Sequence, residues 1–343
     1  MKISDFMGLR SSCLTVAAVG LAVVCATDAK AQTGSAVPVV VDLGGVLNAD
    51  TDDTLAFTPD GDTVFFDRSI GVAKSVMISR RVKGRWTAPK VASFSGRWFD
   101  QNPVVSPDGS FLIFNSDRPT SRTGKPLVQT FFGKPNPGSN LWKVLRIGDR
   151  WGAPVWLGPA INDGAFIDSP SIVSDGSVYF LRVDRDAVHI FRSQLQAGKY
   201  LPAQRVAIGD PAITTHDPTV APDESFIVFD YGKVKNGLGR LCIAFREGDH
   251  WSKPLDLGDE INRDIPWSPH LGPDHRTVFF TGATHSWSLS LAPWLRGGAS
   301  RSRGLSSSGT ENLHKLAVRP RRYRRCAGRA AAGVHPERRN PAA

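Results

Sequence analysis

The sequence predicts an all-β fold, a β-propeller of four-stranded antiparallel blades. First, a short apolar run, a Pro-Asp-Gly-like turn and a second apolar run recur five times between residues 55 and 280. Second, most of these turns lie 48 to 51 residues apart, about the length of one propeller blade. Third, 33 Gly and 24 Pro in 343 residues are typical of many short strands joined by turns.

The turn motif marks the two inner strands of each blade. Its copies cover residues 55–66, 103–114, 170–180, 218–229 and 269–280. The turn aspartates are Asp60, Asp108, Asp175, Asp223 and Asp274, so the second interval is 67 residues. Proline presets one turn residue, aspartate bonds the backbone and glycine accepts a positive φ. We attribute the long interval to an insertion over about residues 118–138, rich in Pro, Gly, Lys and Thr.

A second motif, Gly followed after one or two residues by Trp-x-x-Pro, alternates with the first. It lies at residues 84–89, 148–154 and 248–254, with a Tyr-Leu-Pro variant at 198–202. Each unit then offers two more apolar runs, for example 141–147 and 150–157, which makes four strands per unit. Trp86, Trp151 and Trp251 are expected to pack between blades; stacking against a ligand is the alternative.

The start of the repeat region carries only the back half of the second motif, at residues 39–48. The Ser-Pro-Asp-Gly pattern resembles the TolB-type, WD-repeat-like β-propeller repeat of exported bacterial proteins, over about residues 37–292. That resemblance implies that the first strand completes the last blade. Five blades are recognisable; a sixth would have to come from residues 296–343, which lack both motifs, so it requires an altered C-terminus.

Residues 1–31 have the pattern of a secretory signal. Lys2 and Arg10 precede an apolar run over 12–26, and Ala29-Lys-Ala31 provides a cleavage site before Gln32. We expect a periplasmic or secreted protein with no membrane span after cleavage, since no later apolar run is long enough. The propeller domain is expected over 32–295.

The net charge of +10 comes from one end of the chain. Residues 296–343 hold 12 Lys and Arg against 2 Asp and Glu, whereas residues 32–295 hold 27 against 28. A balanced body argues against a nucleic-acid partner, which would need clustered cations. The basic, low-complexity tail is predicted to be disordered. It is a frame-shifted or otherwise non-native end, an inert tail or a functional basic tail.

The candidate site lies where the inner strands begin. The first of each unit's strands should line the channel, and polar residues stand just before or within it. These are Asp52, Asp53, Asp100, Asp168, His216, Asp217, Asp264 and His270. They are expected to meet at one channel mouth, where several carboxylates could hold a cation such as calcium, a sugar or a basic peptide. Alternatively, each aspartate caps the entry of its own strand. No other cofactor is predicted.

The favoured function is binding. We expect an exported, TolB-like scaffold, monomeric, whose partner is an envelope protein or peptide rather than a small molecule. The chain has no Gly-x-Ser-x-Gly, no His-Glu-x-x-His and no sialidase Asp-box. The alternative is a carbohydrate-active hydrolase of the glycoside hydrolase type that uses aspartates at the channel mouth. Against it, none of the five Glu lies in an inner run.

Overall fold

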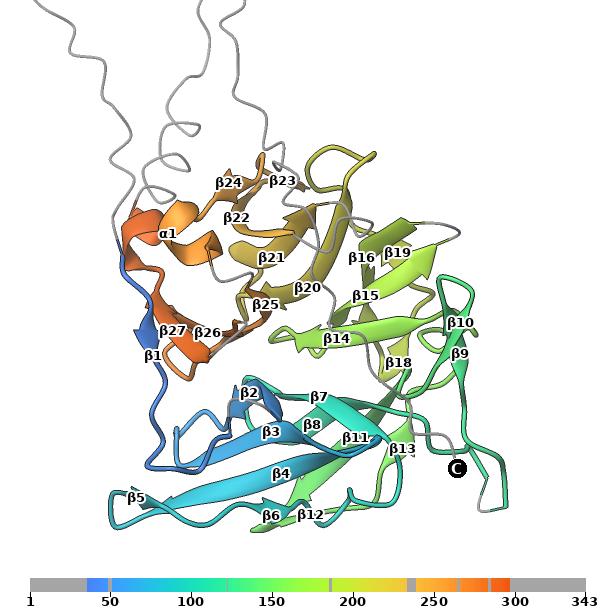
Figure 1. Ribbon diagram of the computed structural model, residues 1–343. Helices are drawn as coiled ribbons and strands as arrows, with labels where there is room; N and C mark the ends of the chain where they lie inside the picture. Colours follow the sequence, from blue (N-terminus) through green and yellow to red (C-terminus); the bar gives the residue numbers. More distant parts are fainter. Residues whose placement is uncertain are drawn as a thin grey trace, which may run out of the picture. The chain divides into compact units, whose positions relative to one another are not determined.

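The computed structural model describes residues 36–48, 51–121, 123–184, 187–232, 239–263, 266–282 and 285–296. They form five small antiparallel sheets arranged in a ring, a five-bladed β-propeller (Figure 1). This confirms the predicted fold class. The predicted signal at 1–31, and the predicted tail beyond residue 296, lie outside the described residues.

Each blade has three long strands and a short outer one. Blade 1 contains β2 (Asp52–Phe57), β3 (Thr63–Ile70), β4 (Ala73–Val82) and β6 (Lys90–Val91). Blade 2 contains β7 (Asp100–Val105), β8 (Phe111–Ser116), β11 (Asn140–Ile147) and β13 (Val155–Trp156). Blade 3 contains β14 (Ile167–Ile172), β15 (Val178–Asp184), β16 (Ala187–Ser193) and β19 (Gln204–Arg205). Blade 4 contains β20 (Thr214–Val220), β21 (Phe226–Gly232), β22 (Arg240–Glu247) and β24 (Leu255–Asp256).

Short hairpin strands extend the third strand of most blades. They are β5 (Arg85–Trp86), β12 (Arg150–Trp151) and β23 (His250–Trp251), with the separate pair β17 (Leu195–Gln196) and β18 (Lys199–Tyr200) in blade 3. The predicted insertion forms its own hairpin, β9 (Gln129–Phe131) and β10 (Lys134–Asn136), between β8 and β11. One turn of helix, α1 (Asp259–Asn262), follows β24, and residues 292–296 after β27 are also helical.

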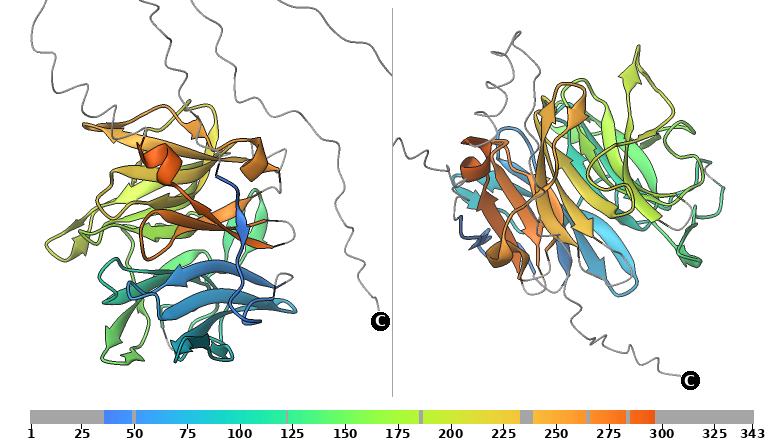
Figure 2. Two further views of the ribbon diagram at one scale, coloured as in Figure 1. Left: turned by 90° about the vertical axis from the view of Figure 1, so that its left-hand side faces the viewer. Right: turned by 90° about the horizontal axis from the view of Figure 1, so that it is seen from above.

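The N-terminal strand closes the ring, as predicted. Blade 5 consists of β25 (Trp267–Leu271), β26 (Thr277–Thr281), β27 (Ser286–Ser290) and β1 (Val39–Val40). Val39 pairs with Ser288, and the Val41 amide donates to the Ser286 carbonyl at 2.9 Å. In Figure 1, β1 lies beside β27 at the edge of that sheet. The inner strands contact one another in chain order and β25 contacts β2, an order that can be followed in Figure 2.

The turn aspartates do what the motif predicted. Each accepts a hydrogen bond from the backbone N–H two residues on, as Asp108 does from Ser110 at 3.0 Å and Asp175 does from Ser177 at 2.8 Å. Such an Asx turn satisfies a backbone donor that the tight turn would leave unpaired. Asp108 also accepts a hydrogen bond from Ser106 Oγ. This bond and then the one from the Ser110 amide hold the pKa of Asp108 below its usual value.

The core is divided among the five blade interfaces. Separate clusters of buried apolar side chains join neighbouring sheets, including blade 4 to blade 5 and blade 5 to blade 1. The motif tryptophans belong to these clusters, which confirms the packing prediction. Trp151 of blade 2 lies edge-on to Phe65 of blade 1, with ring centroids 5.3 Å apart. Each buried aromatic of this kind contributes about 2–3 kcal/mol, so the ring is held mainly by apolar contacts between blades.

Candidate functional site at the channel

All five inner strands bulge at the same point. The pairing with the second strand shifts register once in every blade, for example between Asp53 and Ala56 in blade 1. One residue in each bulge has a positive φ, between 44° and 59°; these are Thr54, Asn102, Ser169, Asp217 and Ser268. Asn and Asp tolerate this conformation better than Ser or the β-branched Thr54. We call these five the bulge residues.

The bulge residues of blades 1 and 2 are linked to blade 3. Thr54 Oγ1 donates to Asn102 Oδ1 at 3.0 Å. Asn102 Nδ2 then donates to Asp168 Oδ1 at 2.5 Å. Asp168 also accepts from the Ser169 amide at 3.0 Å, which is the capping contact that the alternative interpretation expected. A polar chain therefore crosses two blade interfaces.

Asp217 continues this chain around the ring. Ser169 Oγ of blade 3 donates to Asp217 Oδ1 of blade 4 at 2.7 Å. The Ser268 amide of blade 5 donates to Asp217 Oδ2 at 3.3 Å. The contacts together connect all five inner strands, and we call them the bulge network.

A buried lysine enters the same region from the third strand of blade 1. Lys74 Nζ lies 2.7 Å from Asp67 Oδ2 and 3.3 Å from Asp53 Oδ2. Burial opposes the charge on Lys74, but Asp67 and Asp53 prevail and raise its pKa. Burial raises the pKa of Asp67 to about 6 against the attraction of Lys74. Asp53 thus keeps a cationic partner and is held next to the bulge of β2.

Two further carboxyls titrate near neutrality. Burial, and then the charge of Asp217, raise the pKa of Asp168 to about 7. The same two causes raise the pKa of Asp230, which pairs with His216 across β20 and β21, to about 8. Burial lowers the pKa of His216 and leaves its ring neutral at physiological pH, although Asp217 opposes this. The site therefore carries less negative charge at pH 7 than its aspartates suggest.

Three buried oxygens at this level of the second strands lack a described partner. They are Asp67 Oδ1, Asn115 Oδ1 and Asp230 Oδ1. Each belongs to a residue opposite the position just before a bulge residue, and cross-strand neighbours point to the same side of a sheet. A buried acceptor without a donor costs about 1–3 kcal/mol, so these oxygens are suited to water, a cation or a donating ligand.

Asp52 and Asp100 do not join the bulge network; each pairs with an arginine of its own blade. Asp52 forms an ion pair with Arg68 at 2.6 Å and accepts from the Asn48 amide, and Asp100 forms an ion pair with Arg118 at 2.8 Å. Both carboxylates are buried and hold their own blades together. The predicted residue Asp264 lies outside the described residues.

His270 lies on the inner strand of blade 5 and lines the channel cavity. Its Nδ1 lies 3.1 Å from the Ser268 carbonyl, so Nδ1 carries the proton and Nε2 is left as an acceptor. Burial lowers the pKa of His270. The ring is therefore neutral, and it provides the described cavity wall with a polar group among apolar neighbours.

The channel itself is narrow. Every inner strand contributes to the wall of its cavity, with Ala56, Val104, Ser171, Thr219 and His270 at equivalent positions. About 60 Å³ of it is open to the centre of a water molecule. A water needs roughly 10–15 Å³ measured this way, so the cavity holds a few waters.

The donor set at the channel is made of carboxylate and amide oxygens, which are the ligands that calcium prefers. Among the residues that the structure describes, no group of three or more His, Cys, Asp or Glu is arranged to hold a metal. A cation here stays a prediction. Likewise, no helix in the described ranges is long and apolar enough to cross a membrane.

Sequence reasoning found the aspartates but missed how they are linked. Four of the five bulge residues precede proline, in the pairs 102–103, 169–170, 217–218 and 268–269. A short polar residue before Pro, at the same position of four repeat units, was the available signal. Lys74, Asp67 and Asp230 carried no such signal, because they stand on the second and third strands, where the repeat varies.

No protein-family model and no curated protein sequence matches the chain. Among solved structures, a protein assigned as TolB from Agrobacterium tumefaciens is 15% identical, with a TM-score of 0.45 over 72% of this chain and 78% of that one. TolB from Acinetobacter baumannii is 15% identical, with a TM-score of 0.44 over 71% and 56%. A gluconolactonase from Xanthomonas campestris is 13% identical, with a TM-score of 0.40 over 75% and 97%. At such scores the propeller assignment depends on the strand pairing of the chain itself.

Proposed function

We propose that the protein is an exported, monomeric binding propeller of the cell envelope that holds a basic segment of a protein or peptide at the channel mouth. The bulge network is the observation that carries this proposal. It commits the inner-strand polar groups to one another across all five blades. A polar network of this kind suits recognition, because its groups are held in place before a partner arrives.

The charge of the site supports a cationic partner. Asp168 and Asp217 belong to the bulge network and Asp53 pairs with Lys74 beside it, while the acceptors Asp67 Oδ1 and Asp230 Oδ1 have no described donor. An ammonium or guanidinium group at the mouth would supply donors to such oxygens. It would also favour the charged forms of Asp168 and Asp230, whose pKa values burial raises to about 7 and about 8. Binding of a cationic partner is therefore expected to release protons from Asp168 and Asp230.

A lysine-rich peptide tests this proposal. We expect the full chain to bind a labelled oligolysine peptide in a fluorescence anisotropy titration at low salt. The double variant Asp53→Asn with Asp217→Asn should weaken that binding by about tenfold, because each lost charge contact is worth roughly 1 kcal/mol or less at a half-exposed site. The matched control is Asp149→Asn, an exposed residue in the turn between β11 and β12. Equal binding by both variants would contradict the proposal.

One observation favours a second candidate, a carbohydrate-active hydrolase. A carboxyl whose pKa is raised to about 7, as that of Asp168 is, has the proton affinity of a general acid. Release of nitrophenol from chromogenic glycosides, abolished by Asp168→Asn and kept by Asp149→Asn, would support this candidate. A lack of hydrolysis over the common hexosides, together with peptide binding, would leave the binding function.

A further inference from the structure

A second polar site lies away from the channel, in a groove between blades 3 and 4. The groove has a volume of about 310 Å³, at the lower end of the range of about 300–1,000 Å³ that small-molecule pockets span. Three arginines, Arg192, Arg205 and Arg246, line it together with Tyr179 and Trp251. The only acid among its described lining residues is Asp249, which is fully exposed.

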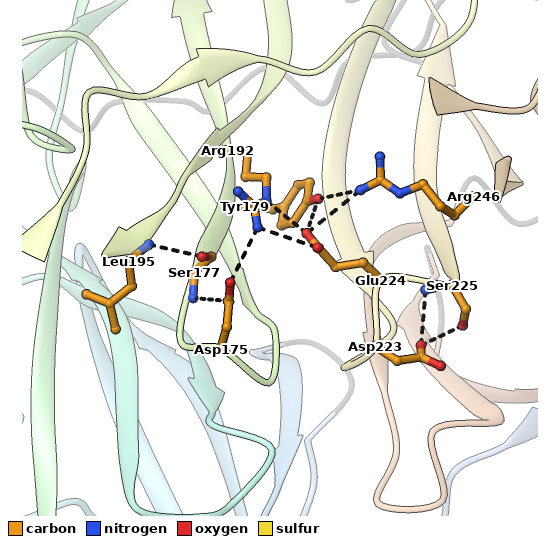
Figure 3. A network of polar contacts seen from close by, with 9 residues as sticks. All are labelled: Asp175, Ser177, Tyr179, Arg192, Leu195, Asp223, Glu224, Ser225 and Arg246. Atoms are coloured by element: carbon orange, nitrogen blue, oxygen red, sulfur yellow. Dashed lines mark hydrogen bonds and ion pairs between the residues drawn. The ribbon is translucent and has the colours of Figure 1, made fainter. Parts of the chain in front are cut away.

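The turn of blade 4 departs from the repeat at this groove. Glu224 takes the place that Gly61, Gly109 and Gly176 hold in blades 1 to 3, and it keeps their left-handed conformation with a φ of 56°. A glutamate in that region is strained, so the contacts of its side chain must compensate. Glu224 accepts hydrogen bonds from Tyr179 Oη and from Arg192 Nε, the latter at 2.8 Å (Figure 3).

The groove face of blade 3 departs from the repeat as well. Tyr179 stands at the position that Phe65 occupies in blade 1, and both rings pack near the tryptophan of the next blade. Arg192 is the residue opposite Tyr179 on β16, where blade 1 has Ile78 opposite Phe65. Blade 3 has therefore exchanged an apolar pair for a hydroxyl and a guanidinium. We call Tyr179, Arg192, Glu224 and Arg246 the blade 3–4 clamp.

Arg246, by contrast, belongs to the repeat and provides an internal reference. It is paired with Trp251 in its hairpin, as Arg146 is with Trp151 and Arg81 is with Trp86. Its guanidinium lies 4.1 Å from the Trp251 ring centroid. Only at the blade 3–4 interface does this repeated arginine meet a described second arginine and a glutamate, with Arg246 Nη2 3.4 Å from Tyr179 Oη (Figure 3).

The three arginines are fixed before any ligand binds. Arg192 is held by Glu224 and stacks 5.6 Å from the Tyr179 ring centroid. Arg205 donates from Nη2 to the Pro211 carbonyl at 2.8 Å. Each contact uses part of a guanidinium, which has five donors, so N–H groups remain for the groove. Guanidinium groups held in place bind carboxylate and phosphate oxygens in pairs.

We propose that the groove between blades 3 and 4 is a second binding site, which takes a carboxylate or phosphate group of a small anionic ligand. The anion lies between Arg205 and Arg246 and contacts the outer donors of Arg192. Glu224 is the internal carboxylate of the same clamp, and it sets how much positive charge the groove offers. This inference is independent of the function proposed for the channel.

Calorimetric titration with inorganic phosphate and, separately, with succinate tests the proposal on the full chain at pH 7.5, with sodium chloride keeping the ionic strength constant. We expect binding of at least one probe in the millimolar range. The double variant Arg205→Gln with Arg246→Gln should weaken it about tenfold or more, since both lost guanidinium groups donate charge-assisted hydrogen bonds to the anion. The variant Glu224→Gln should strengthen it severalfold, because it removes the nearer of the two carboxylates that pair with Arg192 and leaves only Asp175, at 3.6 Å.

The chain provides its own controls. Arg146→Gln removes the repeat-equivalent arginine of blade 2 and should leave the dissociation constant unchanged. The channel variant Asp53→Asn with Asp217→Asn should also leave it unchanged, so failure of one site is distinguishable from failure of the other. The relative affinity for phosphate and succinate identifies the group that is preferred. Two results would overturn the proposal. One is no binding of either probe at a concentration about 20 times the expected millimolar dissociation constant. The other is a loss of affinity in Arg146→Gln as large as that in the double arginine variant.

Discussion

Asp168 is a residue of the site whose protonation is linked to the stability of the fold. It accepts hydrogen bonds from Asn102 Nδ2 and from the Ser169 amide, yet its pKa is raised to about 7, chiefly by burial. Because this value lies above the 3.8 of an exposed carboxyl, folding favours the protonated acid. The stability that results is complete below about pH 4 and is lost as pH rises through 7.

Asp168→Asn should therefore stabilise the protein at alkaline pH. The amide keeps an acceptor for both donors and removes the buried charge. We expect a gain of about 2–4 kcal/mol at pH 8 in urea unfolding, since each pKa unit corresponds to about 1.4 kcal/mol, and almost no gain at pH 4. Asp149→Asn, on an exposed turn, should change neither value. A gain that did not depend on pH would show that the charge of Asp168 is not the cause.

At the scale of the elements, the seam of the ring depends on one short strand that comes from the other end of the described chain. β1 contributes two residues, Val39 and Val40, and both are exposed. The adjoining Val41 amide adds one more bond, to the Ser286 carbonyl at 2.9 Å. The other blades hold their outer strands on the same chain segment, a few residues after the third strand.

Val41→Pro tests the seam. Proline cannot donate to Ser286, so the strand loses one of its few bonds and the edge of β27 opens. We expect a loss of about 1–3 kcal/mol in the free energy of unfolding, measured by urea denaturation. Val37→Pro, outside the strand and 65% exposed, is the control and should have little effect. Equal stability of the two variants would mean that β1 contributes nothing to closure.

The elements differ in how far sequence could predict them. The repeat made the inner strands, the Asx turns and the closing strand predictable, because Pro, Asp and Gly have fixed backbone preferences. The bulge residues were predictable only in type, since their positive φ arises from pairing between strands. The blade 3–4 clamp was hidden, because Arg192 and Glu224 are 32 residues apart and come together only when two blades pack. Departures such as Glu224 in place of glycine were visible, but their partners were not.

For the whole molecule, the excess positive charge lies outside the folded propeller. Residues 32–295 hold 27 Lys and Arg against 28 Asp and Glu, and the excess cations lie after residue 295. The described propeller is therefore close to neutral, with its ion pairs satisfied within and between blades, as in Arg68 with Asp52. Attraction of the full chain to extended anionic surfaces is expected to come mainly from the C-terminal residues.

A chain ending at Arg296 should show this on a heparin column. The full chain is expected to be retained at low salt and released as salt rises, because bound cations displace counterions. The shortened chain should pass through unretained, while its melting temperature stays within about 2 °C of the full chain, since none of the described core is removed. Retention of the shortened chain would place a basic surface on the propeller itself.

The pairing of β1 with β27 joins residues 249 positions apart, at Ser288 and Val39. That bond forms only after nearly the whole repeat region has left the ribosome, whereas every other blade can pair its strands locally. Circular permutation offers a way to move this late step. New termini in the loop between β13 and β14, with a linker joining β27 to β1, would give blade 5 the same local connectivity as its neighbours. The ring would then close by packing one complete blade against another, and closure would become a docking step between preformed sheets.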